Sequence, residues 1–291
     1  MMCAICLSML AACVTARAAE CCGGSAAIIA SITGEARVRS GAASSRVAIL
    51  DRLGPGVTIE TGAKSAAVVL LGNGRRWELG ERARASVDEN VITPLSGPIR
   101  ELPRLPPIPK PAPIAGNPGD VPGAVRFRGP SPPRSLYPFA GASVLRDSVR
   151  LSFSEVPGAS LYRVVLADGE DSVLWRRQTA STSVAVPANL VKPGGSYVWH
   201  VQAMGQGAVL GEADARFAAL SSQTATDRRN FAAAISAQPG LRALLASIDL
   251  QLGLFAEAVD EFSDALRDSP GDPDLQRALT AAKSARAGGE K

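Results

Sequence analysis

The side chains that most often carry out catalysis are scarce in this chain. His200 is the only histidine among the 291 residues, so a Ser-His-Asp or Cys-His arrangement would have to use it. It stands between Trp199 and Val201 and alternates with them, which is typical of a solvated histidine on the outer face of a strand. The chain also contains no P-loop and no dinucleotide-binding fingerprint. We therefore expect no enzyme activity, no catalytic residue and no cofactor.

Side chains that bind metals are equally few. All five cysteines lie within the first 22 residues, so the rest of the chain has no thiolate for a zinc site and no disulfide. Asp168, Glu170 and Asp171 form an acidic cluster, but they lack the spacing of a calcium loop and fall where a hairpin turn is expected. We expect this cluster to be solvated and the chain to hold no metal.

The start of the chain predicts export. Residues 1–18 are apolar and small and end in Ala16-Arg17-Ala18, the pattern of a secretory signal with an A-x-A cleavage site. The segment from Leu10 to Cys13 also resembles a bacterial lipobox, in which Cys13 becomes the lipidated first residue. Both interpretations place the protein in the periplasm or at the outer membrane of a Gram-negative-type bacterium. No other stretch approaches the roughly 20 apolar residues of a membrane-spanning helix, so we expect membrane contact only through a lipid.

Short strands separated by glycine turns are predicted over residues 27–92. The turn signals are Thr33-Gly34, Gly54-Pro55-Gly56, Thr61-Gly62 and Gly72-Asn73-Gly74, with β-branched residues between them. The pattern resembles the domain of the FecR family, iron-dicitrate sensors of the bacterial envelope. Signalling members of that family carry an anti-sigma segment and a membrane helix ahead of this domain. We find neither here and expect no control of a sigma factor.

Two strands of this first unit carry distinct burial patterns. The six residues from Ala66 to Leu71 are all apolar, so we expect this strand to be buried on both faces, either at the centre of a sheet or against a partner or a second copy. The segment from Arg75 to Leu79 alternates, which places Trp77 and Leu79 inside and Arg76 and Glu78 outside.

Residues 93–135 are rich in proline and predict an extended, semi-rigid linker. The linker is basic, with Arg100, Arg104, Lys110, Arg126, Arg128 and Arg134 against Glu101 and Asp120. Such an excess suits an acidic surface such as anionic lipid or cell-wall polymer, although a solvated linker is the simpler interpretation. The overall net charge of +4 is too mild to indicate nucleic-acid binding.

Residues 136–220 predict a β-sandwich, because apolar residues again alternate and turn signals recur. The segment from Leu190 to Trp199 resembles the L-x-P-G-x-x-Y pattern of fibronectin type III domains, with Tyr197 as the expected tyrosine corner. Phe153 stands where these domains usually have a tryptophan. We expect Tyr197 and Trp199 to point inward.

Residues 224–286 predict helices, because apolar residues recur at three and four positions on both sides of Gly253. The spacing resembles one tetratricopeptide repeat, although Arg242 and Asp249 replace its usual aromatic residues. A helix beginning at Asp272-Pro273 is expected to cap the repeat, with a further helix from about Asp227 to Ser236 on its other side. Such repeats bind peptides on the exposed face of their first helix, here Ala243, Ser247, Leu250 and Gln251. Self-association through this face is an equal expectation.

The predicted architecture is therefore a multidomain, mainly β protein: a FecR-like β domain, a linker, a fibronectin-like sandwich and a C-terminal helical hairpin, arranged as modules on a string. Modules of these kinds make contacts, so we expect a non-enzymatic scaffold or sensor adaptor that engages other envelope proteins. The alternatives are a module that binds cell-wall glycan or another surface polymer, and an accessory subunit of a carbohydrate-active enzyme.

Overall fold

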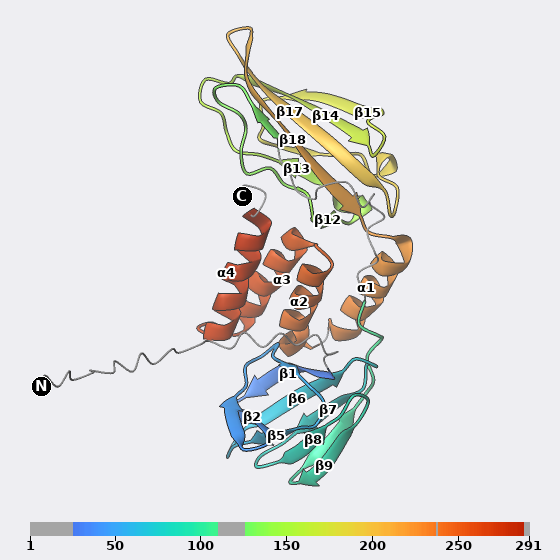
Figure 1. The fold of residues 1–291 in the computed structure, drawn as a ribbon, viewed down its shortest axis with the longest axis vertical. Coiled ribbons are helices and arrows are strands. Elements are labelled where there is room, and N and C mark those ends of the chain that lie inside the picture. The colour runs from blue at the N-terminus through green and yellow to red at the C-terminus, as the bar shows by residue number, and fades with distance from the viewer. Residues whose placement is uncertain (1–25, 110–125, 237, 288–291) are drawn as a thin grey trace, which may run out of the picture.

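The computed structural model describes residues 26–109, 126–236 and 238–287. The fold is mainly β, with 39% of the described residues in strands and a C-terminal helical region of four helices. A first β unit (residues 26–109) and a second β unit (residues 126–220) lie at opposite ends of the molecule, and the helices lie between them (Figure 1). The expected signal segment, including Cys13, lies outside the described residues.

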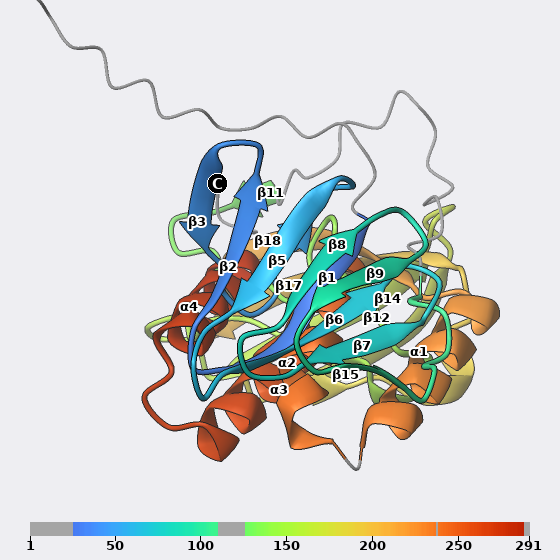
Figure 2. The same cartoon turned by 90° about the horizontal axis from the view of Figure 1, so that it is seen from below.

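The first β unit consists of two antiparallel sheets that face each other across one core (Figure 2). One sheet has the order β10-β7-β6-β1-β4, with β1 (Ala27–Thr33), β4 (Arg52–Leu53), β6 (Ala66–Leu71), β7 (Arg76–Leu79) and β10 (Ile99–Leu102). The other has the order β3-β2-β5-β8-β9, with β2 (Ala36–Ser40), β3 (Ala43–Arg46), β5 (Val57–Thr61), β8 (Arg84–Val87) and β9 (Ile92–Ser96). Ile29 and Val69 from the first sheet meet Ile59 and Val87 from the second in this core.

Strand β6 is buried on both faces, which confirms the prediction made from its unbroken apolar run. It is the central strand of its sheet, between β7 and β1. Ala67, Val69 and Leu71 point into the core of the first β unit, whereas Val68 and Leu70 point the other way, against the helices. The partner on the second face is therefore the C-terminal part of the same chain.

The neighbouring strand β7 corrects a second expectation. Leu79 is buried as predicted and Trp77 is half-buried, but Arg76, expected outside, is also buried. Its guanidinium donates from Nε to the Pro103 carbonyl over 2.6 Å and from Nη1 to the side-chain oxygen of Gln238. The outer face of β7 is covered by the chain, so a side chain that alternation places outside the core is still removed from water.

The linker expected over residues 93–135 is wrong at both ends. β9 pairs with β8 and β10 pairs with β7, which makes residues 92–102 part of the first β unit. β11 (Arg126–Arg128) pairs with β18 (Ala208–Ala219) of the second β unit. Prolines are tolerated on edge strands, and Pro94 lies in β9, the last strand of its sheet. Leu105 is buried as well, so proline content alone overstated the length of the linker.

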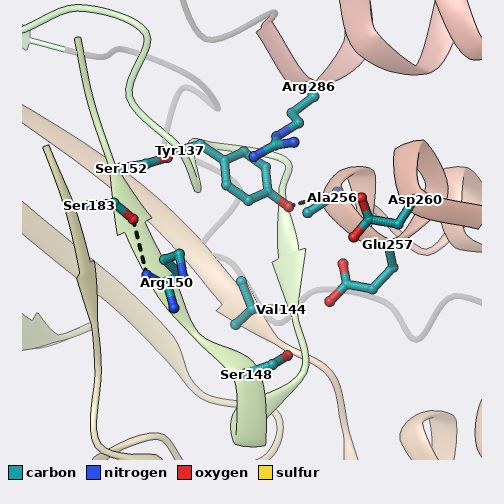
Figure 3. Close-up of a pocket in the computed structure, with 10 residues that line it drawn as sticks. All are labelled: Tyr137, Val144, Ser148, Arg150, Ser152, Ser183, Ala256, Glu257, Asp260 and Arg286. Atoms are coloured by element: carbon teal, nitrogen blue, oxygen red, sulfur yellow. Dashed lines mark hydrogen bonds between the residues drawn. The ribbon is translucent and has the colours of Figure 1, made fainter. Parts of the chain in front are cut away.

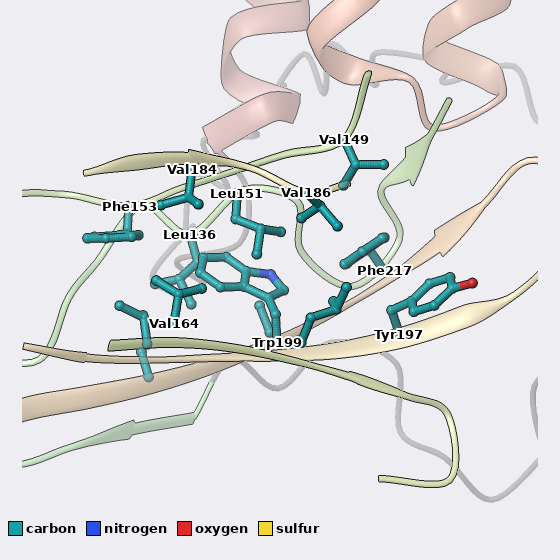
Figure 4. Packing of buried hydrophobic residues seen from close by; sticks show 14 of the residues in the cluster. Leu136, Val149, Leu151, Phe153, Val164, Val184, Val186, Tyr197, Trp199 and Phe217 are labelled. Carbon is teal, nitrogen blue, oxygen red and sulfur yellow. The ribbon is translucent and has the colours of Figure 1, made fainter. Parts of the chain in front are cut away.

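The second β unit also has two sheets around one core (Figure 4). The larger has the order β11-β18-β17-β14-β15, with β12 beside β18; the smaller pairs β13 with β16. Their bounds are β12 (Ser143–Val144), β13 (Arg150–Ser152), β14 (Leu161–Asp168), β15 (Val173–Thr179), β16 (Ser183–Ala185), β17 (Ser196–Gly205) and β18 (Ala208–Ala219). Tyr197 and Trp199 point inward as predicted, and the Lys192 backbone N–H donates to the Tyr197 hydroxyl.

The helical layer consists of α1 (Ser222–Ile235), α2 (Arg242–Gln251), α3 (Phe255–Asp268) and α4 (Pro273–Ala287). Side chains cap two of these helices: Ser221 accepts from the Thr224 N–H over 3.1 Å, and Asp272 accepts from the Leu275 N–H over 3.2 Å. Gly253 separates α2 from α3 at a φ of +76°, as the sequence predicts for a turn between helices. None of the helices in the described part of the chain is long and apolar enough to cross a membrane.

The modules are packed together and are not strung along the chain, which corrects the predicted arrangement. Phe231 of α1 and Leu244 and Ile248 of α2 share one buried cluster with Leu70 of the first β unit. On the opposite side of the helical layer, Phe139 stacks on Phe255 of α3, with ring centroids 5.6 Å apart. The helical layer therefore holds both β units.

Candidate functional site

A cleft of about 350 Å³ lies where the second β unit meets the helical layer (Figure 3). Its residues come from parts of the chain that are far apart in sequence: the segment before β13, strands β13 and β16, and helices α3 and α4. They are Tyr137, Val144, Ser148, Arg150, Ser152, Ser183, Ala256, Glu257, Asp260 and Arg286. Cavities of this size, with a few converging polar groups, are common binding sites for small molecules.

The wall from the second β unit is formed by the outer face of β13 and β16. Leu151 points into the core, so its neighbours Arg150 and Ser152 point the other way, toward the cleft. Leu151 pairs with Val184 on β16, which gives Ser183 the same outward direction. Arg150 is exposed and donates from Nη1 to the Ser183 hydroxyl over 3.4 Å. This wall presents one guanidinium among hydroxyl groups.

The wall from the helical layer carries two carboxylates, those of Glu257 and Asp260, and one guanidinium, that of Arg286 on α4. Glu257 and Asp260 are three positions apart on α3, which places both on the same side of the helix. Glu257 is half-buried, and burial raises the pKa of its carboxyl group above the ordinary value. Among the described residues, no Lys, Arg or His nitrogen lies within the 4.0 Å of an ion pair to either carboxylate.

Tyr137 joins the two walls. Its hydroxyl accepts a hydrogen bond from the Ala256 backbone N–H at the start of α3, over 3.1 Å. The Arg286 guanidinium of α4 lies over its ring, 5.2 Å from the centroid. Burial raises the pKa of Tyr137 to about 12, so the hydroxyl keeps its proton at neutral pH. Tyr137 therefore acts as a neutral bridge that fixes the second β unit on α3.

A buried ion pair lies behind the helical wall. Arg228 of α1 donates to both carboxylate oxygens of Asp249 on α2, from Nε over 2.7 Å and from Nη2 over 2.6 Å. Asp249 has no exposed side-chain area, and this burial raises its pKa to about 6 even though Arg228 pulls it down. The pair fixes α1 against α2, because a charge buried this deeply requires its partner.

The face of α2 expected to contact a partner is largely covered. Ala243 is buried in a cluster with Phe262 and Leu275, and Leu250 packs at the edge of that cluster. Ser247 is half-buried, and of the four only Gln251 is exposed. The expectation that this face is exposed is wrong for Ala243, because α3 and α4 pack on it. Contact of a partner with Ser247, Leu250 and Gln251 stays a prediction.

His200 lies on the outer face of β17, as alternation predicts, and its neighbours there are acidic. Its Nδ1 contacts an Asp214 carboxylate oxygen, and its Nε2 lies 3.6 Å from Glu212. The hydrogen bond from His200 lowers the pKa of Asp214. In the described part of the chain, no three His, Cys, Asp or Glu side chains gather as a metal site would require. Asp168 accepts from the backbone N–H groups of Glu170 and Ser172, which closes the expected hairpin turn.

The charged residues of the cleft were missed in the sequence. Alternation around Leu151 does indicate that Arg150 points outward, and the polar side of α3 contains Glu257 and Asp260. Their meeting could not be predicted, because it depends on how the second β unit sits on the helices. No protein-family model matches the chain, and a search of curated proteins finds no match.

Proposed function

We propose that this protein is a non-enzymatic sensor adaptor of the bacterial envelope, which binds a small ligand in the cleft and engages other envelope proteins through its outer surfaces. One observation carries the proposal: the walls of the cleft come from two different modules, the second β unit and the helical layer. A ligand held by both walls stabilises one arrangement of the modules, which is how binding is transmitted to a partner. FecR-like, fibronectin-like and tetratricopeptide-like modules, which the three parts resemble in sequence, are contact modules of this kind.

The side chains of the cleft suit recognition. The hydroxyl of Ser183 has Arg150 as its side-chain partner, and no histidine lines the cleft. A serine nucleophile needs an adjacent base within hydrogen-bonding distance. The described lining instead combines one bridging tyrosine, hydroxyl groups and charges of both signs, which position a ligand without forming a bond to it.

Glycan recognition is less well supported as the primary role. Binding of sugars and surface polymers by β modules relies on exposed aromatic platforms, and Tyr197 and Trp199 are buried. Phe127, the one aromatic side chain among the large exposed apolar residues described, lies under the Arg134 guanidinium at 5.7 Å. A role as accessory subunit of a carbohydrate-active enzyme requires a separate catalytic chain. Capture of binding partners, described next, would recover that chain.

The test is capture of partners from crosslinked envelopes with the mature protein as bait. We expect a defined set of envelope proteins, and recovery of cell-wall glycan alone would refute the adaptor role. Ser183→Trp fills the cleft and should change the captured set. Gln178→Trp is the control, because Gln178 is exposed on β15 and does not line the cleft.

A further inference from the structure

Both carboxylates of the cleft stand on the wall of the helical layer, which also carries Arg286, and Arg150 is the charged side chain of the opposite wall. Arg150 stands on the wall of the second β unit, and Glu257 and Asp260 stand on the wall of α3 across from it (Figure 3). Among the described residues, no ion pair joins Arg150 to Glu257 or to Asp260.

Arg150 has unused binding capacity. Its guanidinium offers five N–H donors, and among the described side chains it donates to a single hydroxyl, that of Ser183 at 3.4 Å, at the limit of a hydrogen bond. Ser148 and Ser152 add donors on the same wall. A planar guanidinium beside hydroxyl groups matches the geometry of a carboxylate.

Glu257 and Asp260 provide the opposite end. Burial raises the pKa of Glu257, which means that its negative charge is poorly solvated where it stands. No described cation lies within ion-pair distance of it, although the charges of Arg228 and Arg286 lower its pKa from further away. An ammonium group placed between the two carboxylates would relieve that cost.

We propose that the cleft binds a small zwitterion, a free amino acid or dipeptide, with its carboxylate at Arg150 and its ammonium group at Glu257 and Asp260. The inference rests on the proposed function, in which the cleft holds the sensed ligand. The volume of about 350 Å³ lies at the lower end of the range for small-molecule sites, roughly 300–1,000 Å³, which suits a ligand of one or two residues.

Calorimetric titration of the full-length mature protein with alanine and with alanylalanine tests the proposal. The comparison probes are N-acetyl-alanylalanine, which lacks the ammonium group, and alanylalaninamide, which lacks the carboxylate. We expect at least one uncapped probe to bind and each capped probe to bind at least about tenfold more weakly than uncapped alanylalanine, because each loses a charge-assisted contact.

Two variants test which wall of the cleft binds the carboxylate of the ligand and which binds its ammonium group. Arg150→Gln should abolish the preference for the free carboxylate over the amide, and Glu257→Gln should reduce the preference for the free ammonium over the acetylated end. Asp260→Asn repeats the second test at an exposed position where folding is not at risk. Arg146→Gln is the control, because Arg146 is exposed and lies outside the cleft.

Three results would overturn the proposal: no heat of binding for either uncapped probe up to about 10 mM, equal affinity for capped and uncapped probes, or variants that leave both preferences unchanged. If the capped acid binds as well as the dipeptide, the cleft is an anion site only. Partner capture that still depends on Ser183 would then preserve the adaptor role, so the two proposals fail separately.

Discussion

Substitution of Gly253 tests whether the turn between α2 and α3 holds the second β unit on the helical layer. The residue lies in the turn between α2 and α3 at a φ of +76°, and its carbonyl accepts a hydrogen bond from the Ser143 N–H over 2.9 Å. A Cβ at this position would lie 2.8 Å from the Gly141 carbonyl oxygen and 3.1 Å from the Ser143 nitrogen. Both atoms belong to the backbone of the second β unit, so a change of side-chain rotamer cannot relieve the clash.

Gly253→Ala therefore has two costs. Placing an alanine in the left-handed backbone region lowers the unfolding free energy of the protein by about 1–2 kcal/mol. Displacing the segment around Gly141 adds about 1–3 kcal/mol, the usual range for an overpacked contact. The expected total is about 2–5 kcal/mol. Gly271→Ala is the matched control, because Gly271 has a φ of +87° in the next turn and nothing within 4 Å of an added Cβ, so only the first cost applies.

Urea unfolding of both variants measures the difference, and limited proteolysis shows whether the second β unit has separated from the helices. We expect Gly253→Ala to lose the larger free energy and to become sensitive to protease between the β unit and α1. Equal losses in the two variants, with unchanged proteolysis, would mean that this contact does not hold the modules together.

Further variants probe the buried groups. Arg228→Met should lower the unfolding free energy by about 3–5 kcal/mol, because it leaves the Asp249 carboxylate buried without a partner; the double variant Arg228→Met/Asp249→Leu should recover most of the loss. The pKa of Asp249 is raised from 3.8 to about 6, so its contribution to stability is complete below about pH 4 and is lost as the pH rises through 6; Asp249→Asn should flatten this dependence in thermal melts. Arg76→Leu should cost about 1–3 kcal/mol by leaving the Pro103 carbonyl unpaired, whereas Arg75→Leu, which breaks a solvent-exposed pair with Glu101, should change the stability far less. Ala243→Glu should unfold the helical layer and Gln251→Glu should not, as circular dichroism would show; tolerance of both would restore the face of α2 as a partner site.

Local pattern predicted the elements of this fold well. The unbroken apolar run of β6 and the alternation in β17 are direct consequences of how many faces of a strand are buried. Gly253 and the Asp272 cap marked helix ends because their chemistry is local.

What failed depended on contacts between distant parts of the chain. The prediction placed Arg76 outside, because alternation shows only which residues of a strand face the core of its own unit. It does not show that the helical layer covers the other face. Asp249 departs from the repeat pattern because its carboxylate pairs with Arg228 on another helix. The cleft could not be predicted either, since Arg150 and Glu257 are more than 100 positions apart and meet only when the second β unit docks on α3.

The order of the modules along the chain differs from their order in space. The helices that cover Val68 and Leu70 of β6 follow the whole second β unit in the sequence and are synthesised after it (Figure 1). Until they arrive, the first β unit has an uncovered apolar face, which makes a partly made or truncated chain prone to aggregation. A fragment that ends at the second β unit is therefore a poor choice for expression, and a soluble fragment of the first β unit requires the helices to be supplied with it.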